Sequence, residues 1–277
     1  MTVLTVAFDS GSNTYERLLT AFHASVRQNM PEVTFEVLRP EHKERTKGMR
    51  WGFYANTVKL WAWRDYVQSC DDELILADCD MLMIRDASHA FDEDFDIAYT
   101  KRTGQQRIPI NNGIIMVRPT AAAREFIEEW ARVNQQMHDD RDFHAKWKKK
   151  YPGMNQAAFG YVLEEGQHRA KLHEYGTRVW NAVEPDWSHL SEETVFVHFK
   201  GAIRRKLMAG QYPTGAYADV ILLWYEYAEN VPPLSLKARK IMERSGKRHG
   251  RRGHNAKVYS ALMKHNRPPA EEGKVVV

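Results

Sequence analysis

The chain has 277 residues, of which 43% are hydrophobic, and a formal net charge of +4. This length and composition allow one substantial hydrophobic core and exclude an intrinsically disordered chain. The apolar runs are too short to cross a bilayer, the first residues lack a basic leader and a cleavage site, and two cysteines exclude a disulfide framework. We therefore expect no transmembrane segment and a cytoplasmic location.

The charge is distributed unevenly along the chain. Residues 237–267 contain eleven Lys and Arg against one acid and carry +10, whereas residues 1–236 carry −5. The pair Pro232-Pro233 precedes this change and is typical of a boundary. We expect a folded domain over residues 1–231 and a basic, partly helical C-terminal segment over residues 232–277.

The N-terminal part alternates between strand and helix patterns. Residues 5–9 predict a strand, apolar residues at helical spacing predict a helix from residue 13 to about residue 29, and residues 34–38 predict a second strand. A second helix, whose apolar face includes Tyr54 and Val58, leads into the next strand. This order indicates an α/β sheet, in which ligands bind beyond the carboxyl ends of the strands.

The third strand, residues 73–77, ends in Asp78-Cys79-Asp80 and is followed by a second apolar run. In an extended segment, side chains two residues apart point the same way, so Asp78 and Asp80 can converge on one cation. Carboxylates suit Mg²⁺ or Mn²⁺, which keep positions open for substrate phosphates. The alternative is a turn at the strand end that hydrogen-bonds its own backbone.

The remaining patterns extend the α/β order. Residues 97–100 and 114–117 predict strands around a loop at residues 111–113, and residues 138–150 indicate a solvated connection. Later elements are an amphipathic helix around Trp130, a short helix at 156–165, a strand at 194–199 ended by Gly201, and a helix at 217–229.

Five segments, taken in order, resemble the glycogenin and galactinol-synthase group of GT-A glycosyltransferases, which is similar to glycosyltransferase family 8. The resemblance spans residues 3–206, about three quarters of the chain. The matching segments are Thr57-Val-Lys-Leu-Trp-Ala-Trp63, Leu76-Ala-Asp-Cys-Asp-Met-Leu82, Asn111-Asn-Gly-Ile114, Asn155-Gln156 and Val197-His-Phe-Lys-Gly201.

This resemblance implies a Rossmann-like nucleotide-diphospho-sugar transferase fold, with a single mixed sheet flanked by helices. It implies an enzyme that depends on Mn²⁺, or on Mg²⁺, and transfers a hexose from a nucleoside diphosphate sugar, most often UDP-linked, to a hydroxyl. Asp78, Asp80 and His198 would be the metal ligands. An imidazole among carboxylates favours Mn²⁺ over Mg²⁺. Taken alone, His198 could equally be a core histidine.

The resemblance also implies a donor site. Phe8, Asp9 and Tyr15 would surround the nucleotide base, and Lys59 would lie near the donor phosphates, although Tyr15 alone could be a core residue and Lys59 an exposed helix lysine. Asp78 would contact the donor through the metal.

The resemblance implies further donor contacts from Asn111, Asn112 and the segment from Gly201 to Arg204. Asn111 and Asn112 would hydrogen-bond the sugar hydroxyls, although an Asn-Asn-Gly turn would have the same sequence. The family motif His-Phe-x-Gly-x-x-Lys-Pro-Trp continues here from Gly201 to Arg204, so Arg204 keeps the phosphate-binding charge while the Pro-Trp pair is lost.

The chain departs from the family at the predicted catalytic pair. The usual Asp-Gln is Asn155-Gln156 here, and an amide cannot act as a general base or as an ionised nucleophile. Gln156 could still support a retaining reaction by polarising the reacting face of the sugar. The stereochemical outcome stays open.

The basic segment indicates an anionic acceptor. Lys247, Arg248, Arg251 and Arg252 concentrate charge among glycines, a composition that can follow a phosphate backbone. Our hypothesis is that the acceptor is DNA, through a hydroxymethylated pyrimidine whose base is extruded from the duplex. The alternatives are a surface glycan or protein acceptor, or a non-catalytic nucleic-acid-binding protein on a transferase scaffold. The sequence does not indicate the oligomeric state.

Overall fold

The computed structural model describes residues 1–8, 14–41, 51–102, 108–208 and 218–228. Asp9, the four predicted nucleic-acid contacts and the basic segment over residues 232–277 lie outside these ranges. Within the described ranges, no helix combines the length and the hydrophobicity needed to span a membrane.

Strands and helices alternate through most of the described chain. In order they are β1 (Thr2–Val6), α1 (Thr14–Asn29), β2 (Thr34–Leu38), α2 (Trp51–Ser69), β3 (Leu74–Ala77), β4 (Met81–Met83), η1 (Ser88–Asp92), β5 (Ile97–Lys101), β6 (Ile110–Val117), α3 (Ala121–Asp139), α4 (Arg141–Lys148), α5 (Met154–Glu165), β7 (Leu172–Gly176), α6 (Thr177–Trp180), η2 (Glu184–His189), β8 (Phe196–His198), α7 (Ala202–Met208) and α8 (Ala218–Ala228).

The central sheet has six strands in the order β2-β1-β3-β6-β5-β7. β1 is parallel to β2 and β3, β6 is antiparallel to β3 and β5, and β7 is parallel to β5. The predicted α/β architecture with a mixed sheet is therefore confirmed. β1, β2 and β3 end at the same edge of the sheet, which is the edge where ligands bind in such folds.

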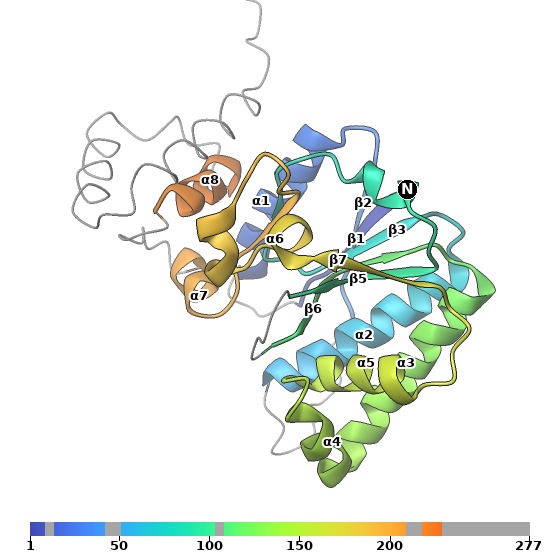
Figure 1. The fold of residues 1–277 in the computed structure, drawn as a ribbon. Coiled ribbons are helices and arrows are strands. Elements are labelled where there is room, and N and C mark those ends of the chain that lie inside the picture. Colours follow the sequence, from blue (N-terminus) through green and yellow to red (C-terminus); the bar gives the residue numbers. More distant parts are fainter. Residues whose placement is uncertain (9–13, 42–50, 103–107, 209–217, 229–277) are drawn as a thin grey trace, which may run out of the picture.

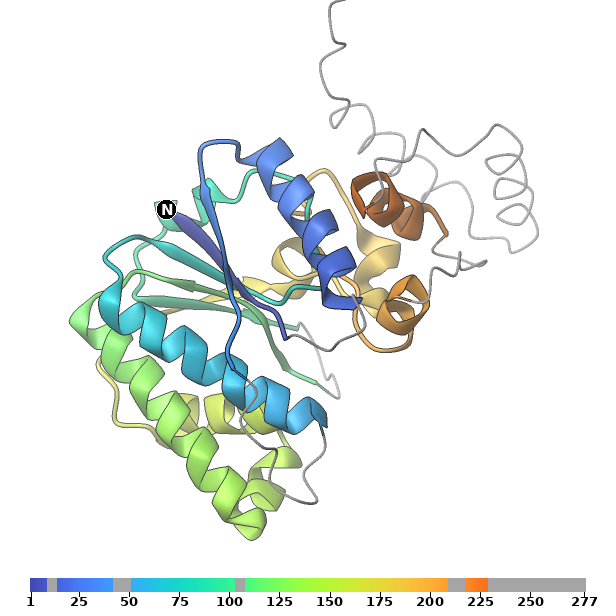
Figure 2. The ribbon, with the colours of Figure 1, turned by 180° about the vertical axis from the view of Figure 1, so that it is seen from behind.

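Helices cover both faces of this sheet. α2, α3 and α5 lie on one face, and α1 lies on the other with α8 packed against it (Figures 1 and 2). Trp63 and Trp130 are completely buried on the first side, and Trp224 is completely buried beside α1. Because both faces are covered, all four residues of β3 are buried, which explains its continuous apolar run.

A separate two-stranded sheet, which the sequence pattern did not predict, pairs β4 with β8. The pairing is antiparallel and places Met81 opposite His198. The backbone N–H of Phe199 also donates to the carbonyl of Asp80, at 2.8 Å. This small sheet therefore joins the segment after β3 to a segment more than a hundred residues later.

Three local predictions were wrong. Residues 111–113 belong to β6 and are not a loop, because the strand pairing continues to Ile110 opposite Lys101. Asp78 and Asp80 follow the end of β3 as expected, but Cys79 and Asp80 form a turn before β4, so the pair does not have the expected extended geometry. Residues 138–150 contain α4, whose first N–H groups donate to the Asp140 side chain.

The error over residues 138–150 has a simple cause. His144 and Trp147 are the buried residues of α4, and two buried positions among many charged ones form too weak an apolar pattern to predict a helix.

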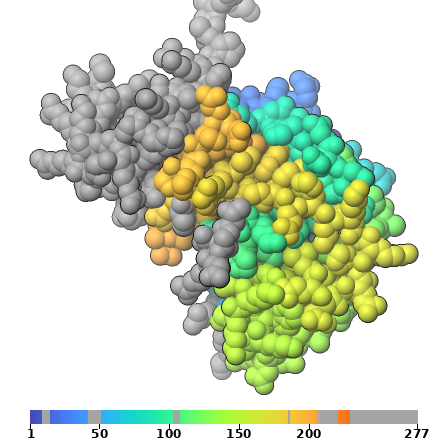
Figure 3. Space-filling model, in the orientation of Figure 1, coloured from blue at the N-terminus to red at the C-terminus, as the bar shows by residue number. Residues whose placement is uncertain are grey.

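The segment from α5 to η2, yellow in Figure 3, lies across the face of the molecule that is turned toward the viewer.

Candidate active site

Two aspartates and one histidine converge where the two sheets meet. Asp78 follows β3, Asp80 precedes β4, and His198 ends β8. One ligand atom from each of these side chains lies within 4.8 Å of the others, an arrangement that could hold a metal ion. Asp80 and His198 are almost fully buried and Asp78 is partly exposed, so the cluster opens to one side.

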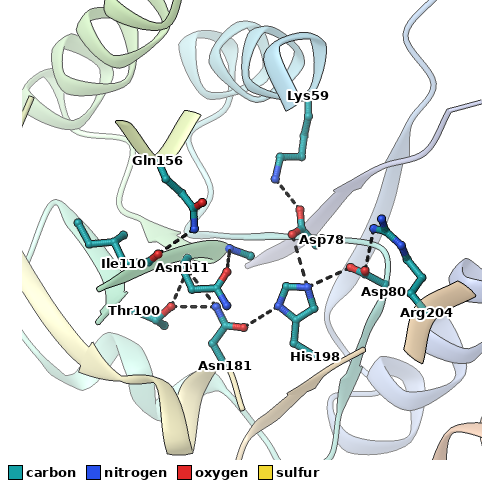
Figure 4. A network of polar contacts seen from close by, with 11 residues as sticks. Lys59, Asp78, Asp80, Thr100, Ile110, Asn111, Gln156, Asn181, His198 and Arg204 are labelled. Atoms are coloured by element: carbon teal, nitrogen blue, oxygen red, sulfur yellow. Dashed lines mark hydrogen bonds and ion pairs between the residues drawn. The ribbon is translucent and has the colours of Figure 1, made fainter. Parts of the chain in front are cut away.

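Each carboxylate divides its two oxygens between a basic side chain and the imidazole (Figure 4). Asp78 accepts from Lys59 Nζ at 2.5 Å through Oδ1 and places Oδ2 3.7 Å from His198 Nε2. Asp80 accepts from Arg204 at 3.0 Å through Oδ2 and places Oδ1 3.2 Å from the same Nε2. One oxygen of each aspartate is thus directed at the centre of the cluster.

The other nitrogen of the imidazole is held by Asn181. His198 Nδ1 lies 2.9 Å from Asn181 Oδ1, while Asn181 Nδ2 donates to Thr100 Oγ1 at 2.9 Å and to the Asn111 carbonyl at 3.0 Å. The two donor contacts fix the orientation of the amide, so Oδ1 accepts and Nδ1 carries the hydrogen. Nε2 is then the nitrogen that faces the carboxylates, and without its hydrogen it can bind a cation.

Gly113 makes room for this imidazole. A Cβ atom at this position would lie 2.6 Å from His198 Cε1 and 3.3 Å from Asp78 Oδ2. The backbone of β6 therefore passes directly against the cluster, and only glycine allows this approach without displacing the ring.

The electrostatics keep Asp80 ionised. Burial alone would raise the pKa of its carboxyl group, but His198 and Arg204 together lower that pKa well below its ordinary range. Asp80 in turn raises the pKa of Arg204. Between the aspartates, burial raises the pKa of the Cys79 thiol well above its ordinary value, so Cys79 stays a neutral core residue.

A polar cavity of about 180 Å³ lies on the open side of the cluster. Besides the cluster residues, it is lined by the amides of Asn111, Asn112, Asn155 and Gln156. Both amide atoms of Asn112 and Nδ2 of Asn111 are buried, and none of them has a hydrogen-bond partner among the described residues. Buried amides without partners are costly, and a polyhydroxylated ligand would satisfy them.

A second cavity, of about 120 Å³, adjoins the first and has an aromatic wall formed by Phe8, Tyr15 and Trp51. Phe8 packs edge-on against both other rings, with centroid distances of 6.1 Å to Tyr15 and 5.9 Å to Trp51. Burial raises the pKa of Tyr15, which stays a neutral phenol. The two cavities share Asn56, Lys59, Asp78, Asp80 and Arg204.

Most of the predicted site residues therefore line one composite cleft. Asn155 and Gln156 lie at the start of α5, and Gln156 Nε2 donates to the Ile110 carbonyl at 2.8 Å. Gly201 lines neither cavity; its φ of +69° turns the chain from β8 into α7, which carries Arg204 to Asp80.

Four residues of the site were not predicted from the sequence. Lys200 lines the polar cavity and stands inside the matched motif, where its charge was a usable signal. Asn56 lies one helical turn before Lys59, and Trp51 begins the same helix. Asn181 had no signal in the sequence, because its contact with His198 exists only in the folded chain.

Comparisons with known proteins agree with this geometry. A family model described as Nucleotide-diphospho-sugar transferase matches residues 65–208, just over half of the chain, including Asp78, Asp80, His198 and Arg204. A comparison with curated proteins gave no match.

Several solved structures are similar in fold. One is a glycosyltransferase involved in the glycosylation of the major capsid of PBCV-1, with a TM-score of 0.55 and 12% identity over 76% of this chain and 97% of that chain. The galactosyltransferase LgtC, in complex with donor and acceptor sugar analogs, has a TM-score of 0.55 and 13% identity over 87% of this chain and 99% of that chain. The glycosyltransferase GlyE of Streptococcus pneumoniae TIGR4 has a TM-score of 0.57 and 11% identity over 98% of this chain and 66% of that chain.

Proposed function

Because the chain belongs to the nucleotide-diphospho-sugar transferase family and has the GT-A fold of glycosyltransferases, we propose that it transfers a hexose from a UDP-sugar to an acceptor hydroxyl with the help of a divalent cation. Within the family we place it in the glycogenin and galactinol-synthase group. The observation that carries the proposal is the convergence of Asp78, Asp80 and His198 at the junction of an aromatic cavity and an amide-lined cavity.

The cluster fits a divalent cation. One oxygen of each carboxylate and Nε2 of the imidazole face a common centre, and a mixed oxygen and nitrogen set favours Mn²⁺ over Mg²⁺. When bound, the cation supplies positive charge that stabilises the departing diphosphate. Asp78, Asp80 and His198 would hold it.

Different residues around the cluster would bind different parts of the donor. Phe8, Tyr15 and Trp51 would surround the uracil ring, because aromatic faces bind bases by stacking. Lys59 and Arg204 stand at the junction, where the diphosphate lies in this arrangement, and both can donate to its oxygens.

The amide-lined cavity would hold the sugar. Asn111 and Asn112 have unsatisfied buried amide atoms that match sugar hydroxyls. Gln156 is oriented by its bond to the Ile110 carbonyl and lines the same space as Asn155.

No third carboxylate lines the cavity among the described residues, so these residues offer no carboxylate to act as a general base or as a nucleophile there. We infer a retaining reaction on one face of the sugar. The bond between the anomeric carbon and the diphosphate oxygen breaks, the acceptor oxygen bonds to that carbon, and the acceptor proton passes to the departing oxygen. Gln156 would polarise the reacting face.

For the acceptor we propose a hydroxymethylated pyrimidine in DNA. The support is the charge of residues 237–267, which carry +10 next to a body that would repel a polyanion. A protein or glycan acceptor is the alternative, supported by the similarity in fold to an enzyme involved in capsid glycosylation.

The proposal is tested by incubating the full chain with Mn²⁺ and UDP-glucose and measuring the release of UDP. We expect metal-dependent hydrolysis that Asp80→Asn abolishes. Asp94→Asn is the matched control, because Asp94 belongs to a surface Asp-x-Asp pair, pairs with Lys171 and lines neither cavity. Hydrolysis unaffected by Asp80→Asn would contradict the proposed metal site, and the absence of UDP binding would support the non-catalytic alternative.

The acceptor is tested by transfer to hydroxymethylated duplex DNA at rising salt, with the full chain and a variant in which Lys247, Arg248, Arg251 and Arg252 are changed to Gln. We expect weaker binding and a shallower salt dependence in the variant. Equal transfer by both proteins would contradict a role of the basic segment in binding the acceptor.

A further inference from the structure

The described lining of the polar cavity has one more basic side chain than it has carboxylates. Three basic side chains line it: Lys59, Lys200 and Arg204. Lys59 is paired with Asp78 and Arg204 with Asp80, which uses both carboxylates of the cavity. In the described part of the chain, Lys200 has no hydrogen-bonded or ion-paired partner.

Lys200 lies at a particular end of the composite cleft. Lys59 and Arg204 line both cavities and therefore stand at the junction, whereas Lys200 lines only the amide-lined cavity. It shares this end with Nδ2 of Asn111 and the whole amide of Asn112, which have no hydrogen-bond partner among the described residues. Its position is that of the transferred sugar or of the acceptor beside it, on the side away from the aromatic wall.

This position is an unfavourable one for a cation in the absence of a ligand. Lys200 is half-buried in the wall of the cavity, and a buried charge without a partner is costly. A lysine whose only role was structural would reach solvent or pair with an acid. An anion bound in the cavity would offset the cost of burying this charge, because hydrogen bonds to charged groups are among the stronger ones in proteins.

We propose that Lys200 binds an anionic substituent, a carboxylate or a phosphate, carried by the substrate group that occupies the amide-lined cavity. The inference rests on the proposed function and narrows its substrate class. The anion has two possible sources: the carboxylate of a uronic acid in the donor, or a phosphate next to the acceptor hydroxyl. Neutral hexoses would satisfy the amides of Asn111 and Asn112 and leave Lys200 without a partner.

The test is equilibrium binding to the full chain in the presence of Mn²⁺, with two arms. The donor arm compares UDP-glucuronic acid with UDP-glucose, and the acceptor arm compares glucose 6-phosphate with glucose in saturating UDP. Each arm uses the wild type, Lys200→Met and Lys200→Arg. Arg205→Met is the matched control, because Arg205 is exposed on α7 next to Arg204 and lines neither cavity.

We expect the wild type to bind the anionic ligand of one arm at least roughly tenfold more tightly than its neutral counterpart. Lys200→Met should lose this preference, whereas Lys200→Arg and Arg205→Met should keep it. The arm that shows the preference identifies the source of the anion.

Binding of UDP alone distinguishes a failure of the role proposed for Lys200 from a failure of the proposed function. If all variants bind UDP but neither anion is preferred, or if Lys200→Met keeps the preference, the role of Lys200 is overturned and the proposed function stands. If the wild type does not bind UDP with Mn²⁺, the proposed function fails and the inference fails with it.

Discussion

Asn181 Oδ1 accepts a hydrogen bond from His198 Nδ1 across 2.9 Å. This contact leaves Nε2 as the ring nitrogen that is available to a cation. Asn181 is completely buried, and its own amide is oriented by Thr100 and by the Asn111 carbonyl. The hydrogen-bonded chain therefore extends from β5 and β6 to the tip of β8. The geometry of the cluster therefore depends on residues that lie outside it.

Replacing Asn181 with Leu should weaken Mn²⁺ binding by roughly 10–100-fold, the usual effect of losing a partner that orients a metal-binding histidine. Calorimetric titration of Mn²⁺ measures this directly. Asn134→Leu is the matched control, because Asn134 is equally buried and donates to Thr57 Oγ1 but lines neither cavity. We expect both variants to lose about 1–3 kcal/mol of stability. Equal metal affinity in the two variants would contradict the role of Asn181.

Gly113→Ala should displace the imidazole, since the added Cβ would lie 2.6 Å from His198 Cε1 and 2.7 Å from its Nδ1. We expect loss of Mn²⁺ binding in a protein that still folds, read from the broadening of the His198 ring signals by Mn²⁺. Gly176→Ala, where a Cβ would meet nothing within 4 Å, should behave like the wild type. Normal Mn²⁺ affinity in Gly113→Ala would mean that the ring does not need this space.

Tyr15→Ala should weaken UDP binding by about 1–3 kcal/mol if the aromatic wall stacks on the base, whereas Tyr15→Phe should retain most of the affinity. The measurement is competition between UDP and inorganic diphosphate. The diphosphate should bind all three proteins alike, because Lys59 and Arg204 stand at the junction of the cavities and not at the aromatic wall. A loss of diphosphate affinity in Tyr15→Ala would indicate general damage to the cleft.

Glu174 should contribute an acid-sensitive part of the stability. Burial opposes ionisation, but Lys101, at 2.7 Å, and Tyr99, at 2.6 Å, donate to its carboxylate and lower its pKa. Because the folded-state pKa lies below the ordinary value of about 4.3, this contribution is complete above pH 4.3 and is lost as the pH falls through the folded-state pKa. Since the pair is half-exposed, we expect about 1 kcal/mol or less.

Urea unfolding of Glu174→Gln at pH 7 and pH 3 checks this contribution. The variant should be less stable than the wild type at pH 7, and the difference between the two should be smaller at pH 3. Glu165→Gln, at the exposed end of α5, is the control and should follow the wild type at both values. A constant difference between Glu174→Gln and the wild type would exclude ionisation as its cause.

The order of elements could be predicted because local patterns carried it. The apolar run of β3 is continuous since both of its faces are covered, and the helix around Trp130 repeats its apolar residues at helical spacing. β8 was predicted as a strand from its alternating pattern, but β7, β4 and the pairing of β4 with β8 were missed. A three-residue strand and a strand with partly exposed residues have no distinctive period.

The extent of β6 shows the same limit from the other side. Asn111 and Asn112 read as a polar loop, yet they are buried strand residues whose amides line a cavity. From sequence alone, a polar residue in a strand is easily mistaken for a loop residue. The cavity that its side chain lines is known only from the folded structure.

By itself, the sequence determined the alternation of strands and helices and the chemical identity of the site residues, because composition and short-range spacing are local properties. Only the tertiary structure decided that the turn at Asp78 and Asp80 meets His198, and that Asn181 and Gly113 support the ring. Those contacts arise from the pairing of β4 with β8 and of β3 with β6, which joins segments that no local period relates. The unpaired charge of Lys200 likewise emerged only when the fold had assigned the two aspartates to Lys59 and Arg204.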